Sequence, residues 1–190
     1  MDNSGEFQAE VSGCLDSLYG YALLLARSSQ DAEDLLQDSL VRAFRGFDSF
    51  DRGLSFKAWM LRIVRNAHID RQRRRKARPV EEPPWDDADS PAGASSDSPL
   101  YSIPLAPEDI LLRRETVERV REGIRRLPPP MREVVELREI EGLSYLEIAA
   151  IVDRPVGTVM SRLYRGRNLL RTYLVEPMRQ DGPARVRHEL

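Results

Sequence analysis

The chain has 190 residues, of which 41% are hydrophobic, enough for the core of one domain or of two small ones. Its formal net charge is −2, yet basic residues cluster in two stretches while acidic residues gather between and before them. Cys14 is the only cysteine and the two histidines, His68 and His188, lie far apart, so the composition excludes an intramolecular disulfide and a zinc site built from cysteines or clustered histidines.

Nothing in the sequence indicates a membrane segment or an export signal. No run approaches 18 consecutive apolar residues, and Asp2 and Glu6 stand where a signal peptide would carry positive charge. We therefore expect a cytoplasmic protein in a reducing compartment. It should need no cofactor or metal and should meet a membrane only through a partner.

Two helices are expected before the first loop. Leucine, alanine and tyrosine at helical spacing predict one helix from about Phe7 to Arg27, interrupted only by Gly20. Ser28 or Ser29 then caps a second helix with an acidic first turn, where the helix dipole favours negative charge. Its buried stripe is predicted to hold Leu36, Leu40, Ala43 or Phe44, and Phe47. Outside this stripe lie Asp31, Asp34, Gln37, Asp38, Arg42 and Arg45, and the helix shows an acidic shoulder. Taken alone, this pattern equally fits a solvated surface helix.

An aromatic loop and a strongly basic helix follow. Phe50, beside Asp51, Arg52 and Gly53, is either a stacking platform for a base or a plug in the core. Ser55 caps a long helix whose inner face is predicted to comprise Phe56, Trp59, Met60, Ile63 and Ala67. The other faces carry Lys57, Arg62, Arg65, Asn66, His68, Arg71, Arg73, Arg74, Arg75, Lys76 and Arg78, with Asp70 as the one acidic residue. Because like charges one turn apart repel, this density favours a polyanionic partner; a solvated basic tail is the alternative.

Residues 79–107 are predicted to form a flexible linker. Seven prolines are interspersed with acidic residues and serines, and the few apolar residues, such as Trp85 and Leu100, bury too little surface to offset the entropy of ordering.

Four helices are expected after the linker. A first stripe holds Val117, Val120, Ile124 and Leu127, and three prolines, residues 128–130, end that helix and begin the next, Met131 to Glu141, which Gly142 closes. Ser144 and Glu147 form a capping box for a short third helix with Tyr145, Ile148, Ala149 and Val152 on one face. Asp153, Arg154 and Pro155 break that helix, and proline suits the start of the next.

The last two helices are predicted to form a helix-turn-helix. Val156, Val159, Leu163, Leu170 and Leu174 form the apolar stripe of the second one, and Gly166 fills its gap, where a small residue lets another helix approach closely. The outward face carries Thr158, Met160, Ser161, Arg162, Tyr164, Arg165, Arg167, Asn168 and Arg171, with no acidic residue between Val156 and Leu174. Such a face suits the major groove of DNA, although a solvated basic face is the plainer interpretation.

The expected fold is all-α, with two small helical domains joined by the linker. The N-terminal domain should span residues 7–78 and the C-terminal domain residues 108–174, with a frayed tail at 175–190.

Two separated segments together resemble one family. DAEDLLQDSLVRAFRGFDSF with FKAWMLRIVRNAHIDRQRRR is similar to the first domain of bacterial extracytoplasmic-function (ECF, group 4) sigma factors of the sigma-70 family. LPPPMREVVELREIEGLSYLEIAAIVDRPVGTVMSRLYRGRNLLR is similar to their second domain. A lone helix-turn-helix is weak evidence, but both motifs in this order are strong evidence.

The resemblance implies a factor that binds RNA polymerase core and directs promoter-specific initiation. Docking on the β′ clamp helices falls to Asp31, Ala32, Asp34, Leu35, Gln37 and Asp38, and the β flap is a second core contact. Recognition of the downstream (−10) box, including capture of a flipped base, falls to Phe50, Asp51, Arg52, Gly53, Ser55, Trp59, Arg62, Asn66, Asp70, Arg73 and Arg74. The upstream (−35) box is read by Thr158, Met160, Ser161, Arg162, Tyr164, Arg165 and Arg167, of which Arg162 and Arg167 suit phosphate or structural roles.

The resemblance also implies an anti-sigma factor that holds the protein inactive. One departure is Met160, because many relatives carry arginine or lysine there, so base preference at one upstream position is open. Two rivals remain: a regulator that binds DNA by itself as a dimer, and a sigma mimic that binds only an anti-sigma factor. An enzyme is the least favoured interpretation, since no paired carboxylates, activated nucleophile or phosphate-binding glycine loop occurs.

Overall fold

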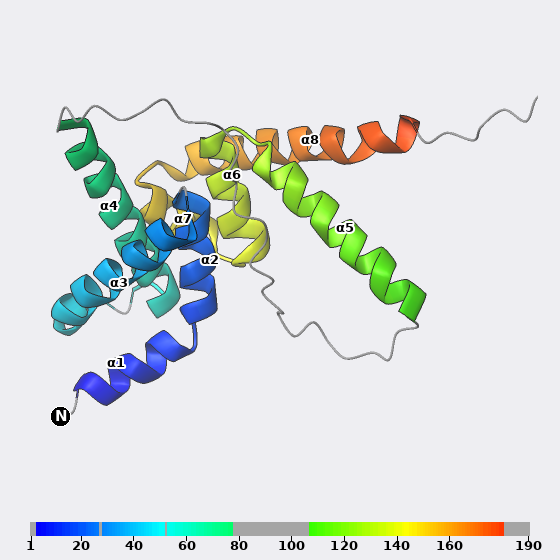
Figure 1. Cartoon of the computed structure of the whole chain (residues 1–190). Helices are drawn as coiled ribbons and strands as arrows, with labels where there is room; N and C mark the ends of the chain where they lie inside the picture. Colours follow the sequence, from blue (N-terminus) through cyan, green and yellow to red (C-terminus); the bar gives the residue numbers. More distant parts are fainter. Residues whose placement is uncertain (1–2, 27, 52, 78–106, 181–190) are drawn as a thin grey trace, which may run out of the picture. The chain divides into compact units, whose positions relative to one another are not determined.

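The computed structural model describes residues 3–26, 28–51, 53–77 and 107–180 (Figure 1). Every regular element in these ranges is helical, as the sequence predicts. The chain divides into two compact units, one of residues 1–98 with 146–154 and one of residues 99–145 with 155–190. The predicted linker falls outside the described residues apart from Pro107, and the predicted domain boundaries remain a prediction.

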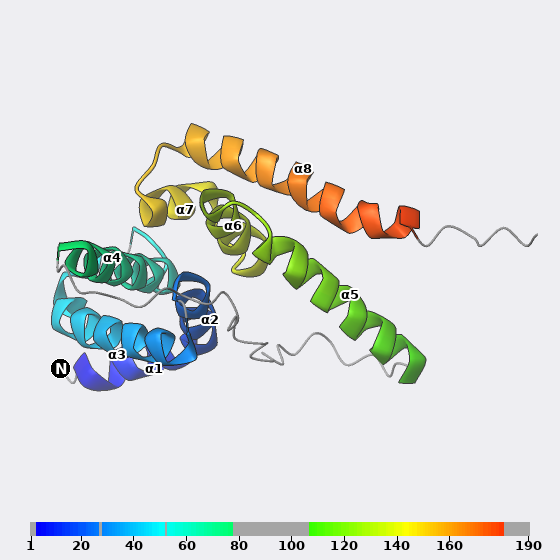
Figure 2. The same ribbon diagram turned by 45° about the horizontal axis from the view of Figure 1, so that its top comes forward.

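The first unit is built on three packed helices. These are α2 (Leu15–Leu25), α3 (Ser29–Gly46) and α4 (Phe56–Ala77), and each packs on the other two. Figure 2 shows α3 and α4 lying side by side. The helix α1 (Asn3–Ser12) precedes them, and the one-turn 3-10 helix η1 (Phe47–Ser49) follows α3. The largest fully buried side chains of this core are Leu18, Tyr21, Leu35, Met60, Leu61 and Val64.

The single helix predicted from Phe7 to Arg27 is wrong, because the chain breaks at Gly13 and Cys14 to give α1 and α2. Glycine is a poor interior helix residue, and side chains satisfy two carbonyls at the end of α1. The Ser12 hydroxyl donates to the Gln8 carbonyl at 2.8 Å, and the Cys14 thiol donates to the Glu10 carbonyl at 3.4 Å. Gly20, the expected interruption, lies inside α2.

Ser28 caps α3 as predicted, because its hydroxyl accepts the Asp31 amide at 3.1 Å. The buried face of α3 is rotated about the helix axis relative to the predicted face. The fully buried residues are Ala32, Leu35, Ser39 and Ala43, while Leu36, Leu40 and Phe47 are half-buried and Phe44 is exposed. Small side chains line the buried face because α2 and α4 both pack against it.

Ser55 caps α4, since its hydroxyl accepts the Ala58 amide at 3.3 Å. Of the predicted inner face of α4, Phe56, Met60 and Ala67 are buried, whereas Trp59 and Ile63 are half-buried. The remaining buried positions are Ala58, Leu61 and Val64, which the sequence pattern did not single out.

The second unit is built on three long elements. These are α5 (Pro107–Arg125), α6 (Pro129–Val135) with its π-helical continuation η2 (Glu136–Ile140), and α8 (Val156–Gln180). Both α5 and α6 pack against α8. The prolines end α5 and begin α6 as predicted, and Gly142 follows η2 with φ of +70°, a conformation that favours glycine. The π turn itself was not predicted.

The expected helix break before α8 is confirmed. Helix α7 (Tyr145–Val152) ends before Asp153, which has φ of 51°, and α8 begins at Val156 directly after Pro155. The Pro155 carbonyl accepts the Thr158 amide at 2.9 Å, the first bond of α8. The predicted end of α8 at Leu174 is wrong, because the helix continues to Gln180. Leu170 and Leu174 keep this half of α8 packed on Gly123 of α5.

Candidate protein and nucleic-acid interfaces

The acidic shoulder of α3 is partly tied to α4. The Arg75 guanidinium pairs with the Asp31 carboxylate at 2.9 Å, and Arg71 donates to the backbone carbonyl of Asp34 at 2.7 Å. Asp34 and Gln37 are exposed, and no interaction of the Asp34 carboxylate is recorded within the described residues. The exposed Asp34 carboxylate is therefore open to a basic partner.

Ala32 and Leu35, which the resemblance assigns to polymerase docking, lie beneath the surface of α3. Ala32 is fully buried and Leu35 is 1% exposed. Their side chains pack into the core of the first unit. They fix the position of α3 and present no surface of their own.

Arg42 connects α3 with α4. Its guanidinium lies 2.9 Å from Asp70 Oδ2 and 3.0 Å from Asp38 Oδ2. The hydrogen bonds that Arg42 donates to Asp70 first and to Asp38 second raise its pKa above the usual value. The carboxylate of Asp70, expected among the DNA-binding residues, is thus held by an arginine of the same unit.

The loop between α3 and α4 carries a layer of aromatic rings. The rings of Phe50 and Trp59 lie 5.0 Å apart between centroids, and Phe50 stacks on Phe47 at 6.4 Å with an interplanar angle of 9°. Asp51 shapes the loop, because its carboxylate accepts the Gly53 amide at 3.0 Å in an Asx turn. Arg52 lies outside the described residues.

The basic side of α4 is open to solvent. Arg62, Asn66, Arg73 and Arg74 are exposed, and within the described ranges no ion pair is recorded for the three arginines. Uncompensated guanidinium groups along one helix suit the phosphates of a nucleic acid.

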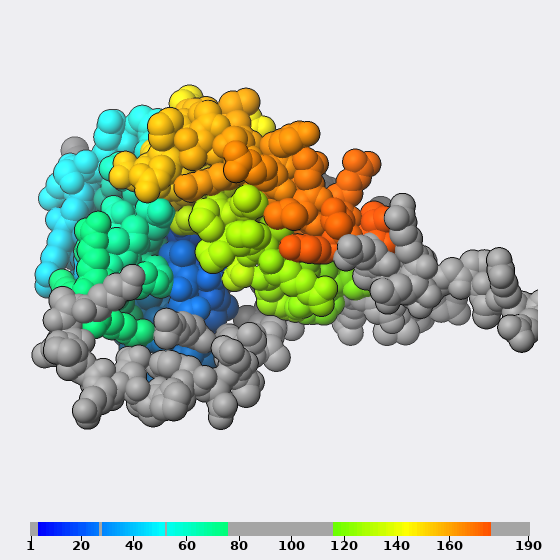
Figure 3. Space-filling model, turned by 90° about the horizontal axis from the view of Figure 1, so that it is seen from above, coloured from blue at the N-terminus to red at the C-terminus, as the bar shows by residue number. Residues whose placement is uncertain are grey.

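The outward face of α8 is exposed as predicted. Tyr164 and Met160 are 69% and 51% exposed, and Ser161 and Arg165 are exposed as well, whereas Thr158 and Arg162 are half-buried. On the opposite face Val159 is fully buried and Leu163 is 2% exposed. Figure 3 shows the side chains of α8 covering a broad surface, in orange. The buried stripe thus fixes which side of α8 faces solvent.

Arg167 points to η2, the continuation of α6, and not away from the unit. Its Nε and a terminal nitrogen lie 2.8 and 2.6 Å from Glu139 Oε1, and hydrogen bonds to Glu139 first and Tyr145 last raise its pKa. Gly166 beside it is buried where α6 crosses, and an added Cβ would lie 2.8 Å from Val135 Cγ2. This close approach confirms the reason given for Gly166.

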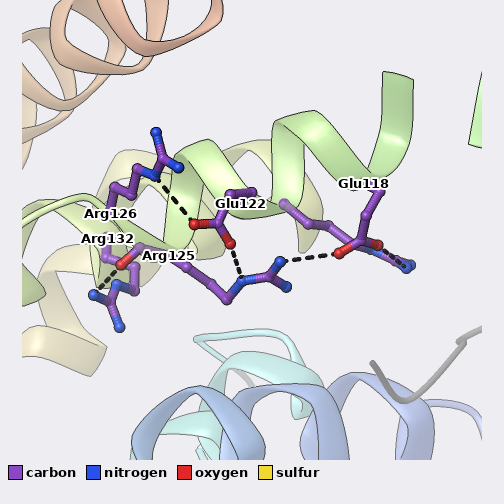
Figure 4. Close-up of polar contacts among 6 residues, drawn as sticks. Glu118, Glu122, Arg125, Arg126 and Arg132 are labelled. Atoms are coloured by element: carbon purple, nitrogen blue, oxygen red, sulfur yellow. Dashed lines mark hydrogen bonds and ion pairs between the residues drawn. The ribbon is translucent and has the colours of Figure 1, made fainter. Parts of the chain in front are cut away.

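A charge ladder on α5 was not singled out from the sequence (Figure 4). Glu118 pairs with Arg125 at 2.9 Å, and Glu122 pairs with Arg125 at 2.8 Å and with Arg126 at 3.1 Å. The arginine hydrogen bonds lower the pKa of Glu122. Arg132 donates to the carbonyls of Arg125 and Leu127 and so caps the end of α5. The i,i+3 and i,i+4 spacing is a signal that could have revealed the ladder.

The described part of the chain holds no cluster of His, Cys, Asp and Glu suited to a metal ion. Among the same residues, no helix has the length and apolarity required to cross a bilayer.

Family models match both halves of the chain. A model described as sigma-70 region 2 matches residues 11–78, and one described as sigma-70, region 4 matches residues 118–170. The match to region 2 covers α2, α3 and α4, and the match to region 4 extends from α5 into α8.

Curated relatives resemble most of the chain. The ECF RNA polymerase sigma factor SigW of Bacillus subtilis (strain 168) is 34% identical over 163 residues, which cover 84% of this chain and 83% of that protein. The ECF RNA polymerase sigma-E factor of Escherichia coli (strain K12) is 36% identical over 146 residues, covering 75% of this chain and 73% of that protein.

Solved structures share the fold. The sigma factor RpoE from Bartonella quintana, in complex with the anti-sigma factor NepR, aligns with a TM-score of 0.62 and 28% identity over 90% of this chain and 97% of that chain. The structure of CnrH in complex with the cytosolic domain of CnrY gives a TM-score of 0.60 and 26% identity, covering 92% and 91%.

Proposed function

The chain belongs to the ECF RNA polymerase sigma factors of the sigma-70 family, and from this we propose how its residues divide the work of promoter recognition. As such a factor it binds RNA polymerase and directs transcription initiation at promoters. We propose that it is a group 4 factor located in the cytoplasm. We also propose that it is not an enzyme and that the polymerase catalyses RNA synthesis.

The acidic shoulder of α3 is the proposed docking face for the β′ clamp helices. Asp34 and Gln37 are its exposed members, and Asp31 and Asp38 contribute charge that Arg75 and Arg42 partly balance. Ala32 and Leu35 act by holding α3 in place. The β flap is the proposed core contact of the second unit.

The aromatic loop and α4 are proposed to open and hold the downstream box. Phe50 and Trp59 offer ring faces for a base removed from the stack, and stacking offsets part of the cost of unpairing. Asp51, Gly53 and Ser55 shape the loop, with Arg52 beside them. Phosphate contacts fall to Arg62, Asn66, Arg73 and Arg74, and Asp70 acts through Arg42.

The outward face of α8 is proposed to read the upstream box in the major groove. Met160, Ser161, Tyr164 and Arg165 face solvent and reach base edges, while Thr158 and Arg162 suit the phosphates at the rim. Arg167, held by Glu139, braces α8 against η2. An anti-sigma factor is a further proposed partner, supported by the RpoE structure, which contains one.

The observation that carries this proposal is the pairing of two exposed basic helix faces, on α4 and α8, with an acidic face on α3 in one sigma-family chain. The test is run-off transcription with core polymerase on a promoter library. We expect transcripts from promoters that share one downstream and one upstream box. Failure to bind core at any concentration contradicts the proposal, and a footprint on duplex DNA without polymerase favours an independent DNA-binding regulator.

A further inference from the structure

All five phenylalanines of the chain lie in one ring network with Trp59. They are Phe7, Phe44, Phe47, Phe50 and Phe56. Four of these rings come from α3, η1, the loop and α4. These segments surround Phe50 and Trp59, which together are called the base platform below. The fifth, Phe7, comes from α1, which carries none of the proposed promoter-binding residues.

Phe7 packs α1 against the ring network. It is 9% exposed, and it is the only side chain of α1 that is buried among those described. Its ring meets Phe44, Phe47 and Phe56 edge to face, at centroid distances of 5.3, 5.2 and 6.1 Å. These are favourable aromatic geometries.

Phe7 reaches the base platform through two intermediate rings. No ring contact is recorded between Phe7 and either Phe50 or Trp59 in the described residues. Phe47 lies 6.4 Å from each of them, and Phe56 lies 5.6 Å from Phe50 and 5.5 Å from Trp59. Phe47 and Phe56, which Phe7 contacts, therefore each contact Phe50 and Trp59.

Local hydrogen bonds shape the turn that carries Phe47 and Phe50. The Phe50 amide donates to the Phe47 carbonyl at 3.0 Å, the Ser49 hydroxyl donates to the Gly46 carbonyl at 2.7 Å, and the Asx turn at Asp51 follows. Phe47 and Phe50 are both half-buried. Beyond these bonds, the two rings pack against each other and against the rings of Phe56 and Trp59.

We propose that Phe7 is a positioning residue for downstream-box recognition. Its ring docks α1 on the aromatic network and, through Phe47 and Phe56, holds Phe50 and Trp59 in the orientation that receives an unpaired base. This inference rests on the function proposed above and adds α1 to the machinery of promoter opening. It assigns Phe7 no contact with DNA.

The test compares Phe7→Ala with Phe7→Leu, which keeps apolar volume but loses the ring. Val11→Ala is the matched control, because Val11 lies on the same helix and has no ring. Full-length variants carry Trp85→Phe, so that Trp59 is the one remaining tryptophan. Three quantities are measured: acrylamide quenching of Trp59, affinity for core polymerase, and affinity of the holoenzyme for a labelled single strand carrying the downstream box.

We expect Phe7→Ala to weaken single-strand binding about tenfold and to increase Trp59 quenching, while core affinity changes less than about twofold. Phe7→Leu should lie between Phe7→Ala and the parent, and Val11→Ala should match the parent. In a Phe50→Ala background the loss caused by Phe7→Ala should shrink to the part that acts through Trp59, because the effects of interacting residues are not additive.

Several outcomes overturn the inference. Unchanged Trp59 quenching and unchanged single-strand affinity in Phe7→Ala would do so, as would a full tenfold loss that persists in the Phe50→Ala background. An equal loss of core affinity would show a general packing role instead. A parent holoenzyme that fails to bind the single strand overturns the proposed function as well, which separates the two failures.

Discussion

The guanidinium of Arg42 on α3 donates to the carboxylate of Asp70 on α4 at 2.9 Å. The same guanidinium pairs with Asp38, so one side chain links the proposed polymerase-binding helix to the proposed DNA-binding helix. Both partners are about one-third to two-fifths exposed, at 32% and 42%, which limits the strength of the pair.

A double-mutant cycle should measure that link. Arg42→Ala and Asp70→Ala should show a coupling free energy of about 0.5–1 kcal/mol, because the pair is partly screened by water. Hydrogen exchange of α3 and α4 amides in the full chain measures it locally. The Arg75 and Asp31 pair, whose arginine is more exposed, should give a smaller coupling. Strict additivity of Arg42→Ala and Asp70→Ala would contradict the link.

Charge reversal at Asp34 should weaken polymerase binding more than reversal at its neighbour. Asp34→Lys places a positive charge on the proposed docking face and should lower core affinity by about tenfold or more, or about 1.4 kcal/mol. Glu33→Lys makes the same charge change on an exposed residue outside that face. Titration of labelled core polymerase measures both. Equal losses would point to net charge rather than to a docking face.

Arg165→Ala should weaken sequence-specific recognition of the upstream box. The expected loss is about 1–3 kcal/mol at the cognate box and little on random duplex, because base contacts specify and phosphate contacts do not. Arg171→Ala removes the same group from a site farther along α8 and should affect both DNAs alike. Competition binding of the holoenzyme distinguishes them. A uniform loss for Arg165→Ala would make it a phosphate contact.

Gly166→Ala should destabilise the second unit, whereas Gly123→Ala should not. A Cβ at Gly166 would meet the branched side chain of Val135 at 2.8 Å, and overpacking of this kind costs about 1–3 kcal/mol. A Cβ at Gly123 would meet the end of the Leu170 side chain at 2.7 Å, and that atom can move. Alanine also gains about 0.5–1 kcal/mol of helix propensity. Urea unfolding followed by circular dichroism compares the two, and equal midpoints would contradict the close-packing argument.

Glu136 should make the stability of the second unit fall as pH rises towards neutrality. Burial first, and the nearby Glu141 second, raise its pKa to about 7 from an ordinary value of 4.5. Between these values the folded state binds more protons than the unfolded state, so the free energy of unfolding decreases with pH. The total is about 3 kcal/mol. Glu136→Gln should remove this slope between about pH 4.5 and 7 in urea titrations. A variant with the parent's slope would exclude Glu136 as its source.

Local chemistry explains which elements the sequence predicted. Ser28 and Ser55 cap α3 and α4, three prolines separate α5 from α6, and Gly142 closes the turn before α7, because each of these is a short-range effect. The exposed face of α8 could also be predicted from its apolar stripe, since helical periodicity alone separates the two faces.

Features that depend on neighbouring elements were not predictable in the same way. The buried face of α3 holds Ala32, Leu35 and Ser39 beside the predicted Ala43, because α2 and α4 pack against it from two sides. The pairing of Arg42 with Asp70 and of Arg167 with Glu139 joins residues 28 positions apart, beyond any local pattern. The break at Gly13 was missed because the apolar spacing runs through it.

The aromatic network has a practical consequence for spectroscopy. Because residues 57–190 contain no phenylalanine, isotope labels on phenylalanine rings give signals from the N-terminal unit alone, even inside a complex the size of an RNA polymerase holoenzyme. The signals of five rings, all joined in one network, would follow the opening of a promoter without interference from the rest of the sigma chain.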